Sequence, residues 1–348
     1  MRQEYDAIVV GGSFAGLAVA ARLRGNVLLI DRNEIGTEQT SACGTTLNVL
    51  ESLGCLDSVL QVYCNGFIHT PSRTIQYDLL YPFCALDYQK LCQTLYERSQ
   101  AKVLRANVLG LSNGYVETDS GLFRGKCIVD ASGWKAVLAS SLKSDFVRKS
   151  DMSFGIETTV DYQGEGLHFW CDSGLVRPGV GWFFPCGKQA RIGIGSYNGH
   201  TGLVPNLISL LNRFRLQPAE MHGGFLPCRL RKSTIGNVFL VGDAAGQCEP
   251  LTGFGIRPAL YFGTKCGDIV QRVIEGRMSL EDGLKQYEGE VGPFRRYHTF
   301  LRWLQDNLMS LPDAPLTRFL AFISWRPVTH HILNWHRKHS LLEVTFPQ

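Results

Sequence analysis

The feature that most constrains the fold of this chain is a glycine-rich turn close to its start. Residues 5–10, Tyr-Asp-Ala-Ile-Val-Val, form an apolar run with β-branched members and predict a buried strand. Residues 11–16, Gly-Gly-Ser-Phe-Ala-Gly, follow directly and lead into a helical pattern that ends at Gly25. A second apolar run, residues 27–30, predicts another buried strand and ends in Asp31. This order of strand, glycine turn, helix, strand and acid is typical of a βαβ unit that binds a dinucleotide.

Each special position in this unit has a physical reason. Gly11 permits the tight turn, and Gly16 lets the helix pack closely on the strand. The helix N-terminus presents free N–H groups to a pyrophosphate, and Asp31 can accept hydrogen bonds from ribose hydroxyls. Ser13 replaces the middle glycine of the usual pattern, but it is small and its hydroxyl can donate to a phosphate. We therefore favour dinucleotide binding over an ordinary glycine-rich bend.

Composition points to a globular, intracellular type of protein. The chain has 348 residues, of which 45% are hydrophobic and 19% charged, so two domains can each bury a core. It shows neither a secretory signal pattern nor a run of about 18 apolar residues, and we expect a cytoplasmic location. The eleven cysteines form no C-x-x-C pair, which favours reduced thiols over zinc or disulfides. His168, His200 and His222 have no metal-binding spacing and receive no role.

The pattern of apolar residues predicts an α/β fold with a discontinuous first domain. Residues 1–61, 83–150 and 229–278 should form the nucleotide-binding domain, including a helix over residues 256–274. Residues 62–82 and 151–228 alternate and carry glycines and aromatics, which predicts an inserted antiparallel-sheet substrate domain. Residues 279–348 read as a helical C-terminal cap, interrupted by prolines at 293, 312, 315 and 327.

Positive charge is concentrated in the C-terminal part. Residues 291–348 hold seven Lys and Arg against three Asp and Glu, which accounts for the whole net charge of +4. Three of the six tryptophans lie there as well. No lysine- or arginine-rich block stands out, so we expect no nucleic-acid partner. We favour a packed cap with a solvated basic face, and a basic, aromatic surface for peripheral membrane contact stays open.

Two more motifs agree with the nucleotide turn. Residues 129–133, Val-Asp-Ala-Ser-Gly, end a predicted buried strand, and residues 241–246, Val-Gly-Asp-Ala-Ala-Gly, end another. A loop with Pro250 and residues 253–256, Gly-Phe-Gly-Ile, follows the second of these. Together the three elements resemble the FAD-dependent oxidoreductases of the aromatic-hydroxylase fold group. The resemblance implies FAD, with the second motif near its adenosine half and Asp243 at the ribityl chain.

The resemblance also implies a set of FAD-binding residues. They are the small or polar residues of the turn, of the loops that follow it and of the two later motifs: Gly11, Gly12, Ser13, Phe14, Ala15, Gly16, Asp31, Arg32, Cys43, Gly44, Val108, Asp130, Gly133, Gly242, Asp243, Pro250, Gly253, Gly255 and Ile256.

Within this group the chain resembles the geranylgeranyl reductase family. The resemblance rests on Cys43-Gly44, on residues 181–185 with their W-x-F-P pattern, and on the loop over residues 250–256. Members reduce isolated prenyl double bonds with reduced flavin in isoprenoid lipid biosynthesis, and they have a long apolar tunnel. Three positions depart from the family pattern. Arg177 and Val180 stand where a Pro and a Tyr are usual, and Tyr88 stands where members often carry an arginine.

Cys43 and Trp182 are the candidate catalytic residues. Cys43 is either an inert buried thiol or a redox or substrate-positioning group. Trp182 is either a core aromatic or, as we favour, a wall of the substrate site. The family resemblance implies an apolar, prenyl-type substrate and leaves the electron donor open between NADPH and a ferredoxin-like protein. The alternatives are an FAD-dependent monooxygenase or halogenase on the same fold, or a prenyl-binding escort protein without chemistry.

Overall fold

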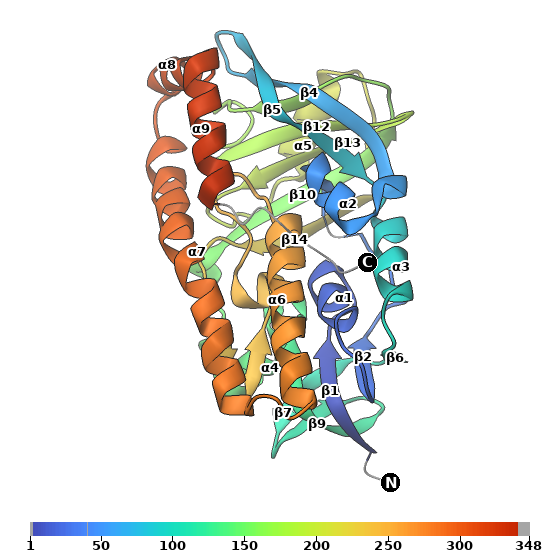
Figure 1. Cartoon of the computed structure of the whole chain (residues 1–348). Helices are drawn as coiled ribbons and strands as arrows, with labels where there is room; N and C mark the ends of the chain where they lie inside the picture. Colours follow the sequence, from blue (N-terminus) through green and yellow to red (C-terminus); the bar gives the residue numbers. More distant parts are fainter. Residues whose placement is uncertain (1–2, 40, 340–348) are drawn as a thin grey trace.

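The computed structural model describes residues 3–39 and 41–339, which form two β-sheets with helices packed around them (Figure 1). The first, sheet A, has a parallel core that begins with the predicted βαβ unit. Its strand order is β15-β16-β9-β1-β2-β6, extended by the hairpin strands β7 and β8. The bounds are Gln3–Val10 (β1), Val27–Asp31 (β2), Lys102–Arg105 (β6), Val108–Ser112 (β7), Tyr115–Thr118 (β8), Gly121–Asp130 (β9), Thr234–Ile235 (β15) and Val238–Leu240 (β16).

Strand β1 is buried on both faces, as its continuous apolar run requires. Ala7 and Val9 belong to one core and Ile8 and Val10 to the other, so alternate side chains fill the two faces of sheet A. Helices α1 (Phe14–Ala20), α3 (Tyr88–Glu97) and α6 (Ile256–Ile274) cover the first face, and α4 (Val137–Leu142) covers the second. Helix α6 has the predicted bounds, whereas α1 ends at Ala20, well before Gly25.

Sheet B is largely antiparallel and is built mostly from the inserted segment. Its order is β14-β10-β13-β12-β11-β4-β5-β3, and the β11–β4 pair is parallel. The bounds are Gly44–Thr46 (β3), Val59–His69 (β4), Thr74–Leu86 (β5), Met152–Asp161 (β10), Leu167–Trp170 (β11), Gly179–Cys186 (β12), Gln189–Ser196 (β13) and Met221–Pro227 (β14). Helix α2 (Leu47–Leu53) lies between β3 and β4 in the chain. Strands β3, β4 and β5 thus extend sheet B beyond residues 62–82, and the proposed domain ranges stay a prediction.

One face of sheet B packs against a helix, and the other face borders the cavity described below. Ile156, Ile192 and Ile194 form a core with Leu207 and Leu211 of helix α5 (Val204–Asn212), which covers the packed face. Because side chains alternate along a strand, the neighbours of these isoleucines point to the opposite face, toward sheet A.

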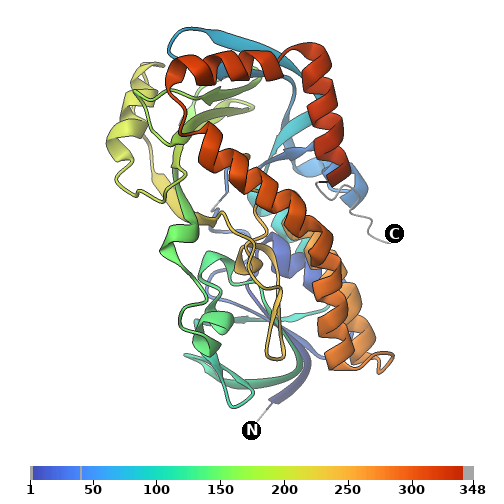
Figure 2. The same ribbon diagram turned by 90° about the vertical axis from the view of Figure 1, so that its left-hand side faces the viewer.

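The C-terminal part is helical, as predicted, but three prolines do not interrupt it. Helix α7 (Leu280–Leu308) continues through Pro293, and Figure 2 shows it running along much of the molecule. The proline ring removes the hydrogen bond to the carbonyl of Gly289, which is exposed and can bind water instead. Pro315 and Pro327 lie in the first turns of α8 (Asp313–Ile323) and α9 (Arg326–His339), where the N–H has no helical partner.

No helix among the described residues is both long and apolar enough to cross a membrane.

Candidate active site

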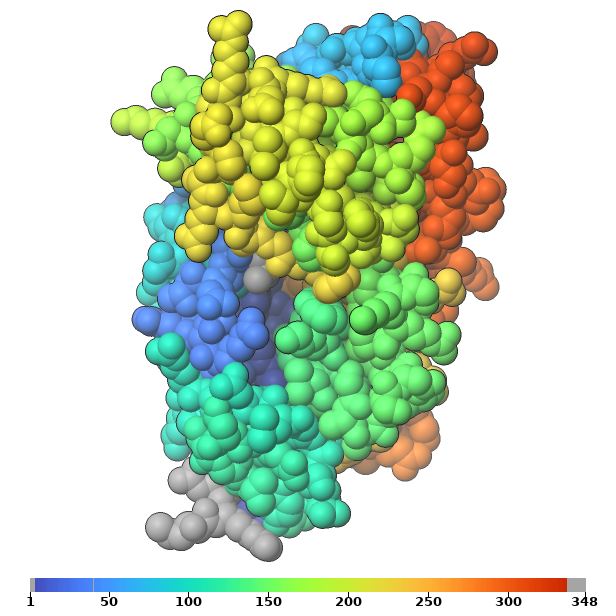
Figure 3. Space-filling view, turned by 180° about the vertical axis from the view of Figure 1, so that it is seen from behind, coloured from blue at the N-terminus to red at the C-terminus, as the bar shows by residue number. Residues whose placement is uncertain are grey.

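A cavity of about 770 Å³ lies between sheet A and the open face of sheet B. Figure 3 shows the surface hollowed at this place, between the blue N-terminal segment and the green middle segment. The nucleotide turn, the Cys43 loop and the two later motifs line one part of it, and strands β10, β12 and β14 line another. All predicted site residues line this cavity except Gly16 and Asp130.

The nucleotide turn is packed too closely for any side chain at its two outer glycines. Gly11 has a φ of +107°, and a Cβ there would lie 2.1 Å from the carbonyl oxygen of Ala131. A Cβ on Gly16 would lie 1.8 Å from the carbonyl oxygen of Gly11. Gly16 therefore serves the packing of α1 on the turn, and its backbone does not face the cavity. The carboxylate of Asp31 accepts hydrogen bonds from N–H of Gly12 at 2.6 Å and of Asn33 at 2.8 Å, which fixes it at the cavity wall.

The open space at other glycines fits an extended dinucleotide. Gly133 and Gly253 line the cavity with φ of +75° and +68°, and a Cβ on either would meet no atom within 4 Å. These loops therefore present bare backbone to the cavity, which is what close approach of a phosphate or a flavin ring requires. With the turn and Asp31, this lining fits FAD, whose redox chemistry would be supplied beside the open face of sheet B.

Asp130 stabilises the second motif without lining the cavity. Its buried carboxylate accepts hydrogen bonds from N–H of Leu138 and Ala139, at 2.9 and 3.0 Å, and from the Ser132 hydroxyl at 2.5 Å. It therefore anchors the start of α4 and the turn before Gly133, one layer behind the cavity. Any effect of Asp130 on FAD would be exerted through that turn.

Arg231 also belongs to this site, although it lies outside the three sequence motifs. Its Nη1 donates to the carbonyl oxygens of Trp134, Asp243 and Ala244 at 3.0, 3.1 and 3.2 Å. It thereby ties the second motif to the third. Burial raises the pKa of Asp243 to about 6, and the charge of Arg231 opposes this shift.

Tyr88, which departs from the family pattern, contacts Ser13, which departs from the usual nucleotide turn. The hydroxyl of Tyr88 donates to Oγ of Ser13 at 3.1 Å, and the Tyr88 ring packs edge-on against Phe14. Val180, another departure from the family pattern, lines the cavity with an apolar side chain. Arg177 is not among the cavity residues and forms an ion pair with Asp313 at the start of α8.

Cys43 is fully buried and its backbone is held in an unusual conformation. Its φ is +54°, in the left-handed region that favours glycine, and its thiol donates to the carbonyl oxygen of Ser41 at 3.2 Å. Burial raises the pKa of the thiol to about 12, although the charge of Arg191 opposes the shift. Arg191 also donates to the carbonyls of Ala42 and Leu86, at 3.2 and 3.1 Å, and so holds the loop in place. Cys43 thus presents a neutral thiol to the cavity.

Trp182 forms part of the cavity wall on sheet B. Its indole lies over Gly193 of the neighbouring strand, because a Cβ there would be 2.1 Å from Cζ2. The indole Nε1 donates to Oε2 of Glu157 on β10 at 2.6 Å. Glu157 is 3% exposed, and His222 on β14 lies beside it with Nε2 at 3.4 Å from Oε1. No role was predicted from the sequence for either Glu157 or His222.

Residues of helices α6, α7 and α9 fix the loop over residues 250–255 through their contacts with Glu249. Glu249, which is 1% exposed, contacts Arg257 of α6 at 3.3 Å, and Tyr297 of α7 and His336 of α9 at 3.2 Å each. Burial alone would raise the pKa of Glu249, but His336, Arg257 and Tyr297 together hold it below its usual range. The loop that lines the cavity is therefore fixed by residues from three helices.

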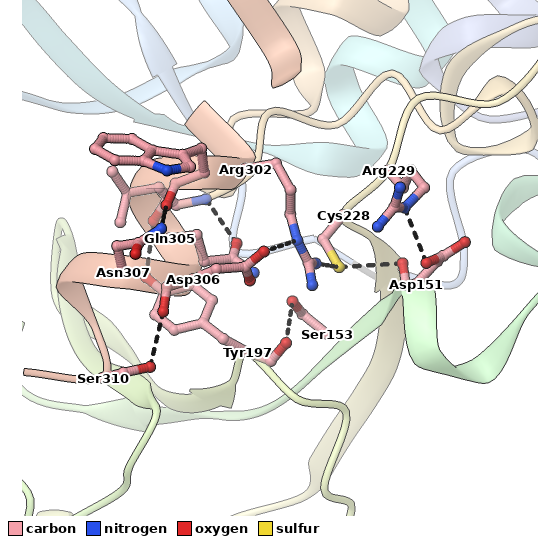
Figure 4. A network of polar contacts seen from close by, with 12 residues as sticks. Asp151, Ser153, Tyr197, Cys228, Arg229, Arg302, Gln305, Asp306, Asn307 and Ser310 are labelled. Carbon is pink, nitrogen blue, oxygen red and sulfur yellow. Dashed lines mark hydrogen bonds and ion pairs between the residues drawn. The ribbon is translucent and has the colours of Figure 1, made fainter. Parts of the chain in front are cut away.

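Helix α7 also closes one side of the cavity. Figure 4 shows Arg302 pointing toward Cys228, whose thiol donates to the carbonyl oxygen of Asp151 at 3.1 Å. Gln305 accepts a hydrogen bond from N–H of Leu251 at 2.8 Å. Cys228 and Gln305 both line the cavity, so these contacts join α7 to sheet B and to the loop at once.

Comparison with known proteins gives relatives over most of the chain. It is 28% identical over 322 residues to digeranylgeranylglycerophospholipid reductase 2 of Methanothermobacter thermautotrophicus, with 82% of each chain covered. It is 26% identical over 358 residues to digeranylgeranylglycerophospholipid reductase 1 of Methanopyrus kandleri, with 92% of this chain and 94% of the relative covered. An FAD-dependent monooxygenase of Penicillium brasilianum is 29% identical, and the match covers 88% of this chain and 63% of that protein. No protein-family model matches.

Solved structures agree on the fold. A geranylgeranyl bacteriochlorophyll reductase-like protein from Thermoplasma acidophilum superposes with a TM-score of 0.84 at 21% identity, covering 97% of both chains. The predicted fold class, an FAD-binding Rossmann-like domain with an inserted antiparallel sheet and a helical C-terminal part, is confirmed. The relatives and the fit of the cavity lead to one conclusion: the chain is an FAD-dependent oxidoreductase, similar over most of its length to digeranylgeranylglycerophospholipid reductases.

Proposed function

We propose that this protein reduces carbon–carbon double bonds in a prenyl chain carried by a glycerophospholipid. The observation that carries the proposal is its similarity, over most of both chains, to two digeranylgeranylglycerophospholipid reductases. The cavity supports it, because the sheet B side presents Phe169, Val180, Phe184, Phe225 and Leu226. Such a wall suits an isoprenoid chain, which offers hydrocarbon and no hydrogen-bonding group.

The protein's contribution to this reaction is positioning and the exclusion of water. When bound and reduced, FAD supplies a hydride to one alkene carbon. The bare backbone at Gly133 and Gly253 would hold the cofactor, and Asp31 would bind its ribose. Trp182 and the aromatic wall would hold the flat alkene in the cavity, and Cys43 would pack against it as a neutral thiol.

The test is anaerobic. The flavin should be reduced chemically and then mixed with a digeranylgeranyl glycerophospholipid. A reductase reoxidises its flavin as the lipid is added, and the product mass rises by about 2 per bond, because each turn adds a hydride and a proton. A flavin that stays reduced until oxygen enters, with a product that gains an oxygen atom, would support the monooxygenase alternative. Binding of the lipid without any change in it would support an escort protein.

We also propose that the helical end of the molecule touches the membrane that holds this lipid. Trp303 of α7, Phe322 of α8 and Trp325 just after α8 are 57%, 60% and 63% exposed. Arg318 of α8 and Arg326 at the start of α9 are exposed as well. Large aromatic side chains beside cations suit the interface of an anionic bilayer.

A further inference from the structure

We propose that Glu157 is the acid that delivers the proton in this reduction, and that His222 returns a proton to Glu157 from solvent. The proposal rests on the proposed function, because reduction of an isolated double bond needs a proton as well as a hydride. Four residues, which the strand register aligns across the open face of sheet B, support it.

These residues stand on four neighbouring strands. Glu157 on β10 pairs with His222 on β14 on one side and with Gly193 on β13 on the other, and Gly193 pairs with Trp182 on β12. The order across the sheet is therefore His222, Glu157, Gly193, Trp182. Three of them, His222, Glu157 and Trp182, line the cavity.

Glycine at position 193 lets Trp182 reach Glu157 across an intervening strand. A Cβ at Gly193 would lie 2.1 Å from Cζ2 and 2.7 Å from Nε1 of the indole, so no other residue leaves room for it. The indole lies on the β13 backbone, and its N–H binds Oε2 of Glu157 at 2.6 Å. One carboxyl oxygen is thus fixed in direction.

The other oxygen of Glu157 is held without a hydrogen bond. Oε1 is buried and has no hydrogen-bonding partner among the described residues, and its contact with His222 Nε2, at 3.4 Å, lacks hydrogen-bond geometry. A buried carboxyl oxygen without a partner is costly and is uncommon unless the site uses it. Glu157 lines the cavity, so this oxygen lies next to the space in which an alkene would bind.

His222 connects this buried carboxyl group to water. Its side chain is 34% exposed, whereas that of Glu157 is 4% exposed. An imidazole changes its charge near neutral pH and is suited to pass protons from solvent to a buried acid. The other charged or titratable groups near this site are Cys43 and Cys186, whose pKa values a negative charge on Glu157 raises, and Arg191, whose charge lowers both.

Bound FAD in its reduced form would supply a hydride, with two electrons, to one alkene carbon and would be left oxidised. The O–H bond of Glu157 breaks, a C–H bond forms at the neighbouring carbon, and a carboxylate remains. An N–H bond of the His222 imidazolium then breaks to restore the Glu157 acid, and the neutral imidazole takes a proton from water. Cys43 is a poorer donor, because its pKa of about 12 disfavours the buried thiolate that donation would leave.

Glu157→Gln is the first variant, because its amide oxygen can still accept from Trp182 while the amide carries no acidic proton. FAD content and lipid binding should match wild type. The rate at which lipid reoxidises the reduced flavin should fall by about 10²-fold or more, the usual contribution of a general acid. Glu157→Ala should be partly rescued by added acetate. Glu220→Gln, with the same charge change at an exposed residue just before β14, should behave as wild type.

Two further readouts separate proton delivery from a structural role. His222→Asn should change the pH dependence of the reoxidation rate while leaving lipid binding intact. The infrared difference spectrum recorded as lipid reoxidises the reduced flavin should contain a carboxyl signal that Glu157→Gln lacks and Glu220→Gln retains.

A wild-type rate in Glu157→Gln, or a loss of lipid binding that matches its loss of rate, would overturn the proposal. If the lipid fails to reoxidise the flavin of wild type as well, the proposed function itself fails, and the role of Glu157 fails with it.

Discussion

Ser13 and Tyr88 show how a changed residue at a cofactor site can be matched by a second change. A serine in the nucleotide turn would leave its hydroxyl without a fixed direction, and Tyr88 supplies a hydrogen bond to it at 3.1 Å. The Tyr88 ring also packs on Phe14, so the pair stiffens the start of α1. We interpret Tyr88, which departs from the family pattern, and Ser13, which departs from the usual nucleotide turn, as one coupled adaptation.

The coupling can be measured. We expect Ser13→Gly and Tyr88→Phe to affect FAD affinity non-additively, with a coupling energy of about 0.5–1.5 kcal/mol, because each removes the same hydrogen bond. Tyr88→Phe keeps the ring contact with Phe14 and isolates the hydroxyl. FAD dissociation constants of the two single variants and the double variant provide the measurement. Strict additivity would mean that the two residues act independently.

Cys43 should be unreactive at neutral pH. Its pKa is raised to about 12 by burial, so the thiol stays protonated below that pH and the reactive thiolate forms only as the pH approaches it. Iodoacetamide labelling followed by mass spectrometry from pH 6 upward should modify the exposed Cys64 well before Cys43. Equal labelling of both at pH 7 would contradict the buried neutral thiol and would reopen a thiolate role.

At the scale of elements, the glycines of β13 leave room for the Trp182 indole to pack on the strand backbone. Gly193 leaves no room for a Cβ, whereas Gly195 would place one 3.3 Å from the ring. Helical and strand propensities do not show such a feature, because glycine inside a strand simply weakens the prediction of a strand. The requirement becomes visible only once β12 and β13 are paired.

Replacing Gly193 by Ala should displace the indole and break its bond to Glu157. We expect a loss of about 1–3 kcal/mol in unfolding free energy, typical of overpacking, with a changed tryptophan emission spectrum. Gly224→Ala is the matched control, because a Cβ at Gly224 on β14 meets no atom within 4 Å. Denaturant unfolding and fluorescence of both variants test this. A Gly193→Ala protein with wild-type stability and emission would show that the indole can move aside freely.

Sequence reasoning succeeded where local pattern decides the structure. The first βαβ unit, helix α6 and the strand-rich insertion all follow from apolar periodicity and glycine position. It failed at Pro293, where burial of Tyr287, Phe294 and Tyr297 keeps α7 continuous despite the proline. The contacts of Glu157 with His222 and of Arg231 with two motifs depend on strand register and tertiary packing between distant segments, which no local pattern specifies.

At the scale of the whole molecule, the proposed membrane surface lies far from the N-terminus. Figure 2 shows α8 and α9 at the end of the molecule opposite the first strand. Phe322 of α8 and Trp325, between α8 and α9, therefore belong to this end of the molecule.

Vesicle flotation tests this surface. Wild-type protein should float with vesicles that contain anionic phospholipid, and the double variant Phe322→Ala, Trp325→Ala should float several-fold less, because buried aromatic area drives interfacial binding. Leu109→Ala is the control, since Leu109 is 64% exposed on β7, at the other end of the molecule. Equal flotation of wild type and the double variant would assign these aromatics to another contact.

The strand order of sheet A has a consequence for how the newly made chain folds. Strand β16, at Val238–Leu240, pairs with β9, which ends at Asp130, and all of β10 to β14 is synthesised between them. A nascent chain therefore cannot complete sheet A, or the loop before α6, until the inserted sheet has left the ribosome. Closing so long a connection is slow and leaves the edge of β9 unpaired meanwhile. FAD can therefore stabilise this protein only late in its synthesis. The need for chaperones should be greatest in the interval before β16 emerges.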